Sequence, residues 1–303
     1  MLTTLSWIAV DWGTSNLRVW AMDAENRVLA SKQSDKGMGA LDPNVFEDAL
    51  LELTDEWLPV DTVTPVVACG MVGAKTGWIE ARYRAVPSTP ISPEMTKAPC
   101  DDPRHAVSII AGMSQFNPAD VMRGEETQIA GFIIENQSFG GSICMPGTHT
   151  KWVRLEDGAV QSFRTVMTGE LFSLMAKQST LRLTVGPDGW DNAAFVDAVQ
   201  MTADAPETLM GELFGLRSMA LVGGMAPGVG RARLSGMLIG AELAATREYW
   251  DETTVRILGG AALSDLYAKA IAAVWGECDV LDGERLTLLG LTAAYTALKE
   301  SRL

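Results

Sequence analysis

The order of apolar and polar residues predicts strands followed by helices, twice along the chain. Apolar runs at Ser6–Val10, Leu17–Met22 and Asn26–Ser31 are separated by short polar turns, a pattern typical of an antiparallel meander. Apolar residues then recur at helical spacing over Asn44–Trp57, and Pro65–Cys69 is a short apolar run. The first part of the chain therefore opens with three strands, a helix and a further buried strand.

From Gly70 to Asp102 the chain is rich in glycine, proline and serine, which predicts a long functional loop region. A strand at Ala106–Ala111 and a helix at Glu125–Glu135 follow. After residue 140 the opening order recurs, with strands expected at Ser142–Pro146, Lys151–Leu155 and Ala159–Arg164. Later helices are expected at Asp191–Thr202, Pro206–Phe214, Arg231–Tyr249, Ala261–Val274 and Glu284–Glu300, and later strands at Thr254–Leu258 and Asp279–Leu281.

The repeated order indicates an α/β chain of two similar halves. Its 303 residues exceed the size at which one core usually stops growing. We expect an N-terminal domain over residues 1–140 and a C-terminal domain over 141–303, with the last helix, 284–300, able to pack back on the first domain.

Composition narrows the classes of partner. Apolar residues make up 47% and charged residues 20%, which is ordinary for a globular protein, and the net charge is −14. This charge argues against nucleic acid or an anionic membrane as the main partner. The four cysteines form no Cys-x-x-Cys pair and the chain has two histidines, so we expect reduced thiols and no zinc site. Met1–Ser6 has no basic flank, so we expect no signal peptide and a cytoplasmic protein.

Two Gly-Thr turns are candidates for binding phosphate. In the first, Gly13, Thr14, Ser15 and Asn16 follow an apolar run, and their backbone N–H groups and hydroxyls suit phosphate oxygens. Asp11 before this turn can hold Mg²⁺, and Arg18 after it can contact phosphate. An ordinary turn is the alternative.

The second turn, Gly147-Thr148, has the same flanks, and two such hairpins facing each other would clamp a triphosphate. Lys151 lies just beyond it and is equally consistent with a surface charge. Gly259-Gly260 stands between a strand and a helix, where glycine lets the backbone approach a flat ligand. Adenosine would lie there in this architecture.

Three further segments carry candidate substrate chemistry. Met122–Gln128 opens a helix with Glu125 and Glu126, which either cap the helix or include a general base. Gly70–Trp78 suits a sugar-binding loop, with core packing of the tryptophan as the alternative. Phe163–Leu171 is a strand-to-helix turn with its own candidate anion site.

Asp11–Arg18 resembles the first phosphate motif of hexokinase-type kinases. Together with Gly70–Trp78, Met122–Gln128, Met145–Val153 and Phe163–Leu171, it resembles the 2-dehydro-3-deoxygalactonokinases. Leu234–Glu242 adds a further similar segment, so the resemblance covers nearly the whole chain in colinear order. The family often has proline where Arg82 stands, and Arg84 is not part of its motif.

The resemblance implies the two-domain actin-like ATPase fold, also called ribonuclease-H-like. Each half would hold a mixed five-stranded sheet with helices, and a cleft would lie between the halves. It further implies ATP, Mg²⁺ and transfer of the γ-phosphate to the 6-hydroxyl of 2-dehydro-3-deoxy-D-galactonate in galactonate catabolism. By position in the family's order Glu126 would be the base, with Glu125 the alternative. The expected substrate-binding residues are Gly73, Trp78, Arg123, Thr127, Arg164, Thr168, Gly169 and Glu170.

Several alternatives stay open at this stage. The acceptor could be another hexonate or a neutral sugar. The chain could instead be a nucleotide-binding regulator or ATPase of the same fold with no phosphoryl acceptor. A sugar-responsive repressor is disfavoured by the net charge of −14 and by the lack of room before Ser6 for a DNA-binding module. For the substrate carboxylate, Arg123 is the first candidate, Arg164 the second, and Arg82 and Arg84 the third.

Overall fold

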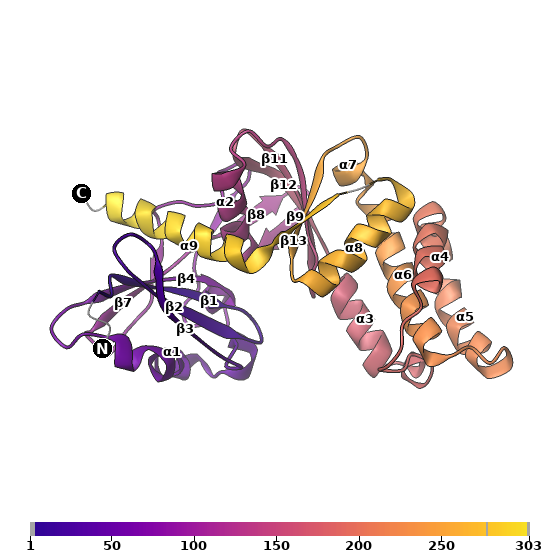
Figure 1. Cartoon of the computed structure of the whole chain (residues 1–303), viewed down its shortest axis with the longest axis horizontal. Helices are drawn as coiled ribbons and strands as arrows, with labels where there is room; N and C mark the ends of the chain where they lie inside the picture. Colours follow the sequence, from indigo (N-terminus) through magenta and orange to yellow (C-terminus); the bar gives the residue numbers. More distant parts are fainter. Residues whose placement is uncertain (1–3, 277, 302–303) are drawn as a thin grey trace. The chain divides into compact units, whose positions relative to one another are not determined.

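The computed structural model describes residues 4–276 and 278–301 (Figure 1). The chain forms two compact units. Unit 1 is Met1–Phe139, Asp157–Gln161 and Gly283–Leu303, and unit 2 is Gly140–Glu156 and Ser162–Asp282. The units are therefore not separated by one cut near residue 140. A short turn and the last helix belong to unit 1, although they follow the first part of unit 2 in sequence.

Unit 1 is built on a sheet with strand order β3-β2-β1-β4-β7-β6. Its strands are β1 (Trp7–Trp12), β2 (Leu17–Met22), β3 (Val28–Ser34), β4 (Thr64–Gly70), β6 (Thr96–Lys97) and β7 (His105–Ile109). The sheet has six strands where five were expected, because the two residues of β6 pair antiparallel with the edge of β7. A second sheet, of order β5-β8-β9, contains β5 (Tyr83–Ala85), β8 (Gly112–Phe116) and β9 (Ala119–Met122). The expected long loop thus contains short strands.

Helices cover both faces of the larger sheet. Alternate residues of β1 point to opposite faces, so Ile8 and Val10 join one core cluster while Trp7 and Ala9 join another. Helix α1 (Phe46–Thr54) packs on the first cluster, and α9 (Gly283–Glu300) packs on the second. Helix α9 also lies against α2 (Glu125–Glu135), as Figure 1 shows.

Glycine makes the contact between α2 and α9 close. A β-carbon on Gly290 of α9 would lie 1.8 Å from the Thr127 carbonyl oxygen of α2. A β-carbon on Gly131 of α2 would lie 2.0 Å from the Leu286 carbonyl oxygen. No side chain fits at either position without moving the backbone. The last helix therefore supports the helix that carries Glu125 and Glu126.

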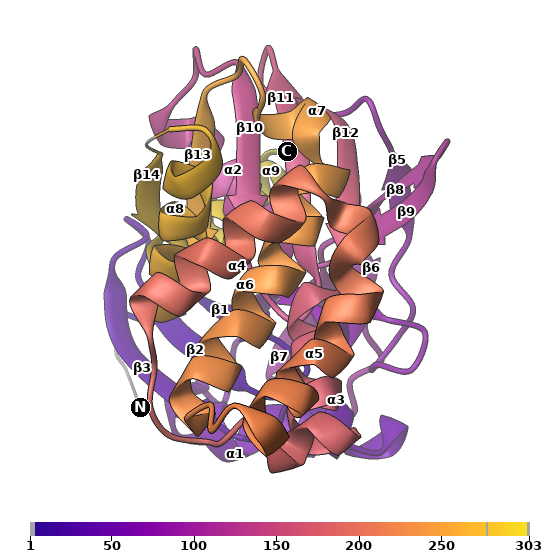
Figure 2. The same cartoon turned by 90° about the vertical axis from the view of Figure 1, so that its right-hand side faces the viewer.

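Unit 2 repeats the plan with a five-stranded sheet of order β12-β11-β10-β13-β14. Its strands are β10 (Gly141–Met145), β11 (Thr150–Glu156), β12 (Ala159–Val166), β13 (Val255–Gly259) and β14 (Asp279–Asp282). Its helices are α3 (Thr168–Lys177), α4 (Asn192–Asp204), α5 (Leu209–Val222), α6 (Pro227–Ala245), α7 (Arg247–Trp250) and α8 (Ala261–Val274). Figure 2 shows α4 and α5 on either side of α6.

Local sequence signals placed several elements well. Glu125–Glu135 and Ala261–Val274 are helices with the predicted bounds. Two predictions were incomplete. The expected helix Arg231–Tyr249 is two helices, α6 and α7. Helix α3 begins at Thr168, inside the motif Phe163–Leu171 that was expected to be a strand-to-helix turn, but its extent to Lys177 was not predicted.

Candidate functional site

The first Gly-Thr turn lies at the tip of the β1–β2 hairpin in unit 1. Asp11 and Arg18 are directly opposite in the antiparallel register, and the Gly13 amide donates to the Asn16 carbonyl at 2.9 Å. The amides of Met38 and Gly39 donate to the carbonyls of Gly13 and Thr14 and hold the turn from outside. Residues 14, 15 and 16 at the tip are exposed. Their hydroxyl and amide groups are therefore free to meet a ligand from solvent.

Arg18 is held by two carboxylates. Its guanidinium lies 2.5 Å from Asp11 Oδ2 and 2.9 Å from Glu284 Oε2 at the start of α9. Burial lowers and the neighbouring Asp11 charge raises the pKa of Arg18, with a net shift upward. Arg18 thus reaches Asp11, the expected metal ligand, through one of the five N–H donors of its guanidinium and reaches Glu284 through another.

Glu126 is a fully buried carboxyl at the start of α2. Its Oε2 accepts the Gly124 amide at 2.7 Å, and its Oε1 is 3.3 Å from the Thr127 hydroxyl. Burial, and then the charge of Glu125, raises the pKa of Glu126 to about 8. A carboxyl with such a pKa exchanges its proton near neutral pH, which suits a general base.

Backbone shape brings Glu126 to the end of β4. Gly124 has φ +106°, and a β-carbon there would lie 3.2 Å from the Gly70 α-carbon, while Gly70 itself has φ +93°. Both conformations favour glycine. Glu125 differs from its neighbour because it is only partly buried and its Oε2 accepts the Arg123 amide at 3.0 Å, which is a helix-capping role.

Cys69 lies between the two key carboxylates of unit 1. It is paired with Asp11 in the parallel register of β1 and β4, and its Sγ is 3.7 Å from Asp11 Oδ1. Burial raises the pKa of the Cys69 thiol, and the charges of Asp11 and Glu126 raise it further. The residue was predicted only as a reduced thiol. Its position at the end of an apolar strand beside Asp11 was the signal that the sequence offered.

Arg123 is a buried guanidinium with free hydrogen-bonding capacity. It is 8% exposed, its Nη2 donates to the Ala81 carbonyl at 2.7 Å, and its guanidinium carbon lies 4.3 Å from the Tyr83 ring centre. Its Nε and Nη1 have no hydrogen-bond partner within residues 4–276 and 278–301. Buried donors are nearly always paired in native proteins, so these two N–H groups are candidates for binding an anion.

Gly73 makes room for that guanidinium, since a β-carbon there would lie 2.8 Å from Arg123 Nη1. Trp78, by contrast, was expected to contact sugar and has a packing role. Its ring is stacked on Phe46 at 6.3 Å and lies edge-on to Trp12 at 6.2 Å. Core packing, the alternative considered for Trp78, therefore accounts for its ring.

The second Gly-Thr turn, in unit 2, is packed against the start of α3. The Glu170 amide donates to the Thr148 carbonyl at 2.9 Å, and a β-carbon on Gly169 would lie 2.3 Å from the Gly147 carbonyl oxygen. Glu170 Oε2 lies 2.5 Å from His149 Nε2. Thr168, Gly169 and Glu170, which were expected to bind substrate, begin the helix on which this turn packs, and Thr168 and Gly169 also line a cavity beside it. The contact is non-local, which is why sequence order alone did not reveal it.

Two other basic candidates in unit 2 are engaged within it. Lys151 is buried, not a surface charge, and its Nζ donates to the Thr165 hydroxyl at 2.8 Å. Arg164 is 42% exposed in its side chain and its Nη2 lies 3.8 Å from Glu248 Oε1. Arg164 is therefore a weaker candidate for the substrate carboxylate than the buried Arg123.

A cavity of about 190 Å³ opens beside the second turn. Apolar side chains of α3, α6 and α8 line much of it, including Phe172, Leu238 and Leu263. The rest of the lining includes Gly147, Thr168, Trp190, Arg231, Ser235 and Tyr267. Gly259 is close, since a β-carbon there would lie 3.6 Å from the Pro146 carbonyl oxygen, whereas a β-carbon on Gly260 would meet nothing within 4 Å. The cavity suits a flat, largely apolar ring.

Glu242 of α6 was part of a motif but had no predicted role. Its carboxylate is 2% exposed and accepts the Trp152 indole N–H and the Tyr267 hydroxyl at 2.8 and 2.7 Å, and also the Thr168 hydroxyl. Burial raises its pKa to about 7. The available sequence signal was a single carboxylate within an otherwise apolar stretch of helix.

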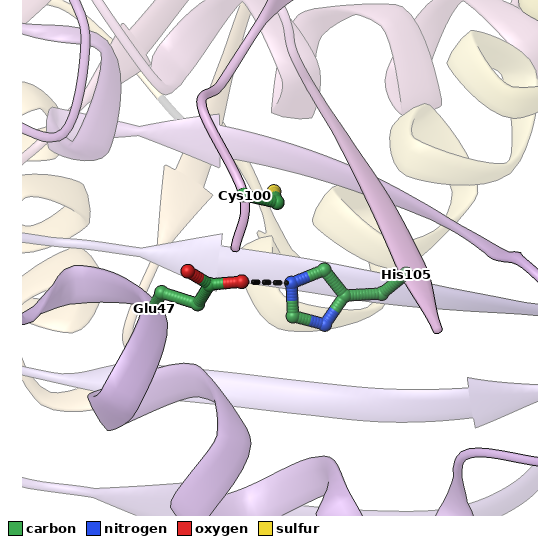
Figure 3. Close-up of side chains that lie close together, drawn as sticks. All are labelled: Glu47, Cys100 and His105. Atoms are coloured by element: carbon green, nitrogen blue, oxygen red, sulfur yellow. Dashed lines mark hydrogen bonds and ion pairs between the residues drawn. The ribbon is translucent and has the colours of Figure 1, made fainter. Parts of the chain in front are cut away.

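A second group of potential ligands lies elsewhere in unit 1. Figure 3 shows Glu47, Cys100 and His105 close together, and their candidate ligand atoms lie within 4.8 Å of one another. Glu47 already accepts the amides of Asp101 and Asp102, and its Oε1 lies 2.9 Å from His105 Nε2. These hydrogen bonds hold the loop before β7 against α1, so the three residues have a structural role in unit 1.

The comparisons with known proteins point to one family of sugar-acid kinases over nearly the whole chain. The family model described as 2-keto-3-deoxy-galactonokinase matches residues 11–294. A Rhizobium meliloti (strain 1021) relative named probable 2-dehydro-3-deoxygalactonokinase is 36% identical, over 98% of this chain and 99% of its own. The Escherichia coli (strain K12) 2-dehydro-3-deoxygalactonokinase is 34% identical, over 91% of this chain and 92% of its own.

Solved structures show the fold. A crystal structure assigned to a 2-dehydro-3-deoxygalactonokinase protein from Sinorhizobium meliloti has a TM-score of 0.89 at 35% identity, covering 96% of this chain and 99% of its own. An activator of 2-hydroxyisocaproyl-CoA dehydratase from Clostridium difficile, with bound ADPNP, has a TM-score of 0.50 at 13% identity and covers 98% of this chain and 96% of its own. The chain has the two-domain actin-like ATPase fold. Within the described residues, none of the helices is both long and apolar enough to cross a membrane.

Proposed function

Since this chain belongs to the 2-keto-3-deoxy-galactonokinase family, it is an ATP-dependent sugar-acid kinase, and we propose that it uses unit 1 to bind the acceptor and unit 2 to bind the nucleotide. The acceptor is 2-dehydro-3-deoxy-D-galactonate, phosphorylated on its 6-hydroxyl in galactonate catabolism. The observation that carries the proposal is the buried Arg123 guanidinium with two unpartnered N–H groups next to the buried Glu126.

Arg123 supplies the positive charge that an anionic substrate needs in a protein of net charge −14. Its Nε and Nη1 donors are free, and Tyr83 and the Ala81 carbonyl hold the guanidinium in place. A guanidinium fixed in this way can donate charge-assisted hydrogen bonds to a carboxylate. A neutral sugar would offer these donors only uncharged acceptors, whose hydrogen bonds are about half as strong as those of a carboxylate.

Glu126 is placed to accept the proton of the acceptor hydroxyl. As the 6-oxygen forms its bond to the γ-phosphorus, the bond from that phosphorus to the bridging oxygen breaks, and ADP leaves. The hydroxyl proton passes to Glu126, which the Gly124 amide and the Thr127 hydroxyl hold in one orientation. Glu125 is occupied by the Arg123 amide, so it is the weaker candidate for this role.

Asp11 is the carboxylate that would hold Mg²⁺. Its oxygens fit a hard cation, and Oδ1 lies 3.7 Å from the Cys69 sulfur. When bound, the ion supplies charge neutralisation for the phosphates. Gly13, Thr14, Ser15 and Asn16 would add hydrogen bonds to phosphate from the exposed turn.

In unit 2, the Gly147-Thr148 turn would hold phosphates and the cavity beside it would take adenine. The cavity, its apolar walls and the open backbone at Gly259-Gly260 lie next to that turn. Family membership and the nucleotide-binding fold together imply ATP as the phosphoryl donor.

A kinase assay tests the proposal directly. The purified protein is offered ATP, Mg²⁺ and one of a panel of 2-dehydro-3-deoxy sugar acids or neutral sugars, and the product is located by ³¹P NMR. We expect a 6-phosphate from 2-dehydro-3-deoxy-D-galactonate and little from neutral sugars. Turnover of ATP without any acceptor would favour the regulator or ATPase alternative, and preference for another hexonate would move the substrate assignment.

A further inference from the structure

The carboxylate of Glu242 is buried in unit 2 without a cation. It is 2% exposed, and its partners are the Trp152 indole, the Tyr267 hydroxyl and the Thr168 hydroxyl. The Thr150 hydroxyl extends this network, at 2.8 Å from the Tyr267 hydroxyl. All of these are neutral groups. Within residues 4–276 and 278–301, no lysine or arginine forms a salt bridge with Glu242.

A buried carboxylate without a cationic partner adds little to the stability of the fold. Taking a carboxylate out of water costs several kcal/mol, and well-packed apolar residues often replace buried ionic groups without loss of stability. The carboxylate does, however, impose a fixed geometry on the groups that donate to it. Two oxygens that accept three donors fix the positions of β11, α3 and α8 relative to α6.

Each of these elements reaches the second Gly-Thr turn or the neighbouring cavity. Thr168 begins α3, and the next two residues pack on Gly147 and hydrogen-bond to Thr148. Trp152 is on β11, the strand that follows the turn. Tyr267 lines the cavity wall. The shape of the turn and the shape of the cavity therefore depend on the same carboxylate.

We propose that Glu242 is a positioning residue that locks the Gly147-Thr148 turn to the wall of the adjoining cavity, and so sets the affinity of unit 2 for a nucleoside di- or triphosphate. This rests on the proposed function, in which unit 2 binds the nucleotide. Glu242 itself touches neither reactant. Its effect passes through Thr168 and Tyr267, which are hydrogen-bonded to it.

The network suits the ionised form of Glu242. Trp152, Thr168 and Tyr267 all donate to its carboxylate, so a protonated carboxyl would place its own O–H only where one of the hydroxyls turned round to accept it. The titratable groups coupled to its charge are Tyr267 on α8 and Cys144 on β10, whose pKa values burial and then Glu242 raise. Both stay neutral over the working range of pH. The pKa of Glu242, raised by burial to about 7, puts its own titration within that range.

The test compares Glu242→Gln with the wild type by calorimetric titration with ADP and, separately, with the sugar acid. Gln keeps the size of the side chain but replaces one acceptor oxygen by a donor. We expect ADP affinity to fall about tenfold or more at pH 8, the scale for a lost hydrogen bond to a charged group. Sugar-acid affinity should change less than about twofold. Tyr267→Phe and Thr168→Val each remove one donor and should weaken ADP binding in the same direction.

Measuring ADP affinity across a pH series shows whether Glu242 positions the nucleotide site or only supports the fold. The ratio of the wild-type to the Glu242→Gln affinity for ADP cancels the ionisation of the nucleotide itself. It should be largest at about pH 8 and approach one at about pH 6, where the protonated Glu242 resembles glutamine. Thr202→Val is the matched control. Thr202 is a buried hydroxyl bonded to the Ala198 and Met237 carbonyls, and its loss should lower the melting temperature without changing ADP affinity.

The outcomes are distinguishable. Wild-type protein that bound the sugar acid but no ADP would overturn the proposed nucleotide unit itself. Wild-type binding of ADP with an unchanged affinity in Glu242→Gln at every pH would overturn only the positioning role. Equal losses of ADP and sugar-acid affinity, tracking the fall in melting temperature, would show that Glu242 merely supports the fold. If Glu242→Gln does not fold, Tyr267→Phe and Thr168→Val decide the question by the same criteria.

Discussion

The guanidinium carbon of Arg123 lies 4.3 Å from the centre of the Tyr83 ring. The ring covers one face of the guanidinium, and the Ala81 carbonyl takes one of its donors at 2.7 Å. Cation–π contact and burial restrict the side chain to one position while its Nε and Nη1 stay unpaired. This relationship turns a long, flexible side chain into a preorganised receptor for a carboxylate, and the first prediction follows from it.

Arg123→Met should raise the KM for the sugar acid about 10- to 150-fold, because a hydrogen bond to a charged group contributes about 1.5–3 kcal/mol. The KM for ATP should change little. Steady-state kinetics with each substrate varied in turn measures both constants. Arg84→Met is the matched control, since Arg84 on β5 donates to the Thr89 carbonyl and is one of the third-ranked candidates for the substrate carboxylate. A selective sugar-acid effect in Arg84→Met and not in Arg123→Met would transfer the role.

Glu126→Gln should lower kcat about 10²-fold, the lower end of the range for a general base, since the transition state of phosphoryl transfer is loose. The affinities for both substrates should hardly change, because the interaction is made mainly in the transition state. Glu125→Gln should have a much smaller effect, since Glu125 Oε2 only caps the Arg123 amide. A larger loss of kcat in Glu125→Gln would move the base by one residue.

The raised pKa of Glu126 predicts opposite pH dependences for activity and stability. A base must be deprotonated, so kcat/KM should rise as pH increases to about 8, the pKa that burial and then Glu125 give to Glu126. Folding instead favours the protonated form, because the ordinary pKa is 4.5. The stability contribution of Glu126 is therefore present below about pH 4.5 and is lost as pH rises through about 8.

Chemical denaturation across this range checks the stability part. The free energy of unfolding of the wild type, relative to Glu126→Gln, should fall between about pH 5 and 8. Because Gln does not titrate, the difference isolates this one group from all other carboxyls. A difference that stayed flat over the range would mean that Glu126 is ionised throughout in the folded protein.

Asp11→Asn should reduce turnover at least tenfold and raise the Mg²⁺ concentration needed for half-maximal activity, because the charged anchor of the ion is lost. Stability should change by about 1 kcal/mol or less, since Arg18 keeps its partner Glu284 at 2.9 Å. Glu284→Gln is the control, because it removes the other partner of Arg18 and leaves Asp11 in place. An identical Mg²⁺ dependence in folded Asp11→Asn would exclude Asp11 as a ligand.

Gly169→Ala should weaken ATP binding about tenfold or more, on the scale of 1–2 lost hydrogen bonds, and leave sugar-acid affinity unchanged. The added β-carbon would lie 2.3 Å from the Gly147 carbonyl oxygen, so the second turn has to move. Gly211→Ala is the matched control in the same unit, since a β-carbon there meets nothing within 4 Å and alanine favours the helix. Equal nucleotide affinity in both variants would remove the second turn from the site.

Much of the local structure could be predicted from the sequence. Glu125–Glu135 and Ala261–Val274 were placed at the observed bounds, because helical periodicity and the glycines before each helix are local signals. The strand before Asp11, the Gly-Thr turns and the repeated order of strands and helices are local in the same sense. The resemblance of colinear motifs then indicated the family and its fold, and the comparisons confirm both.

Only the tertiary structure decided which side chains meet. It buried Arg123 with two free donors, stacked the Trp78 ring on Phe46, and hydrogen-bonded Glu170 to Thr148 of the second turn. It also gathered three donors on Glu242. Periodicity tells which face of a strand or helix is apolar, but strand order and helix packing join residues far apart in sequence. Such long-range pairings place Asp11 opposite Cys69 in neighbouring strands and bring Gly169 against Gly147. Neither contact can be derived from the local sequence pattern.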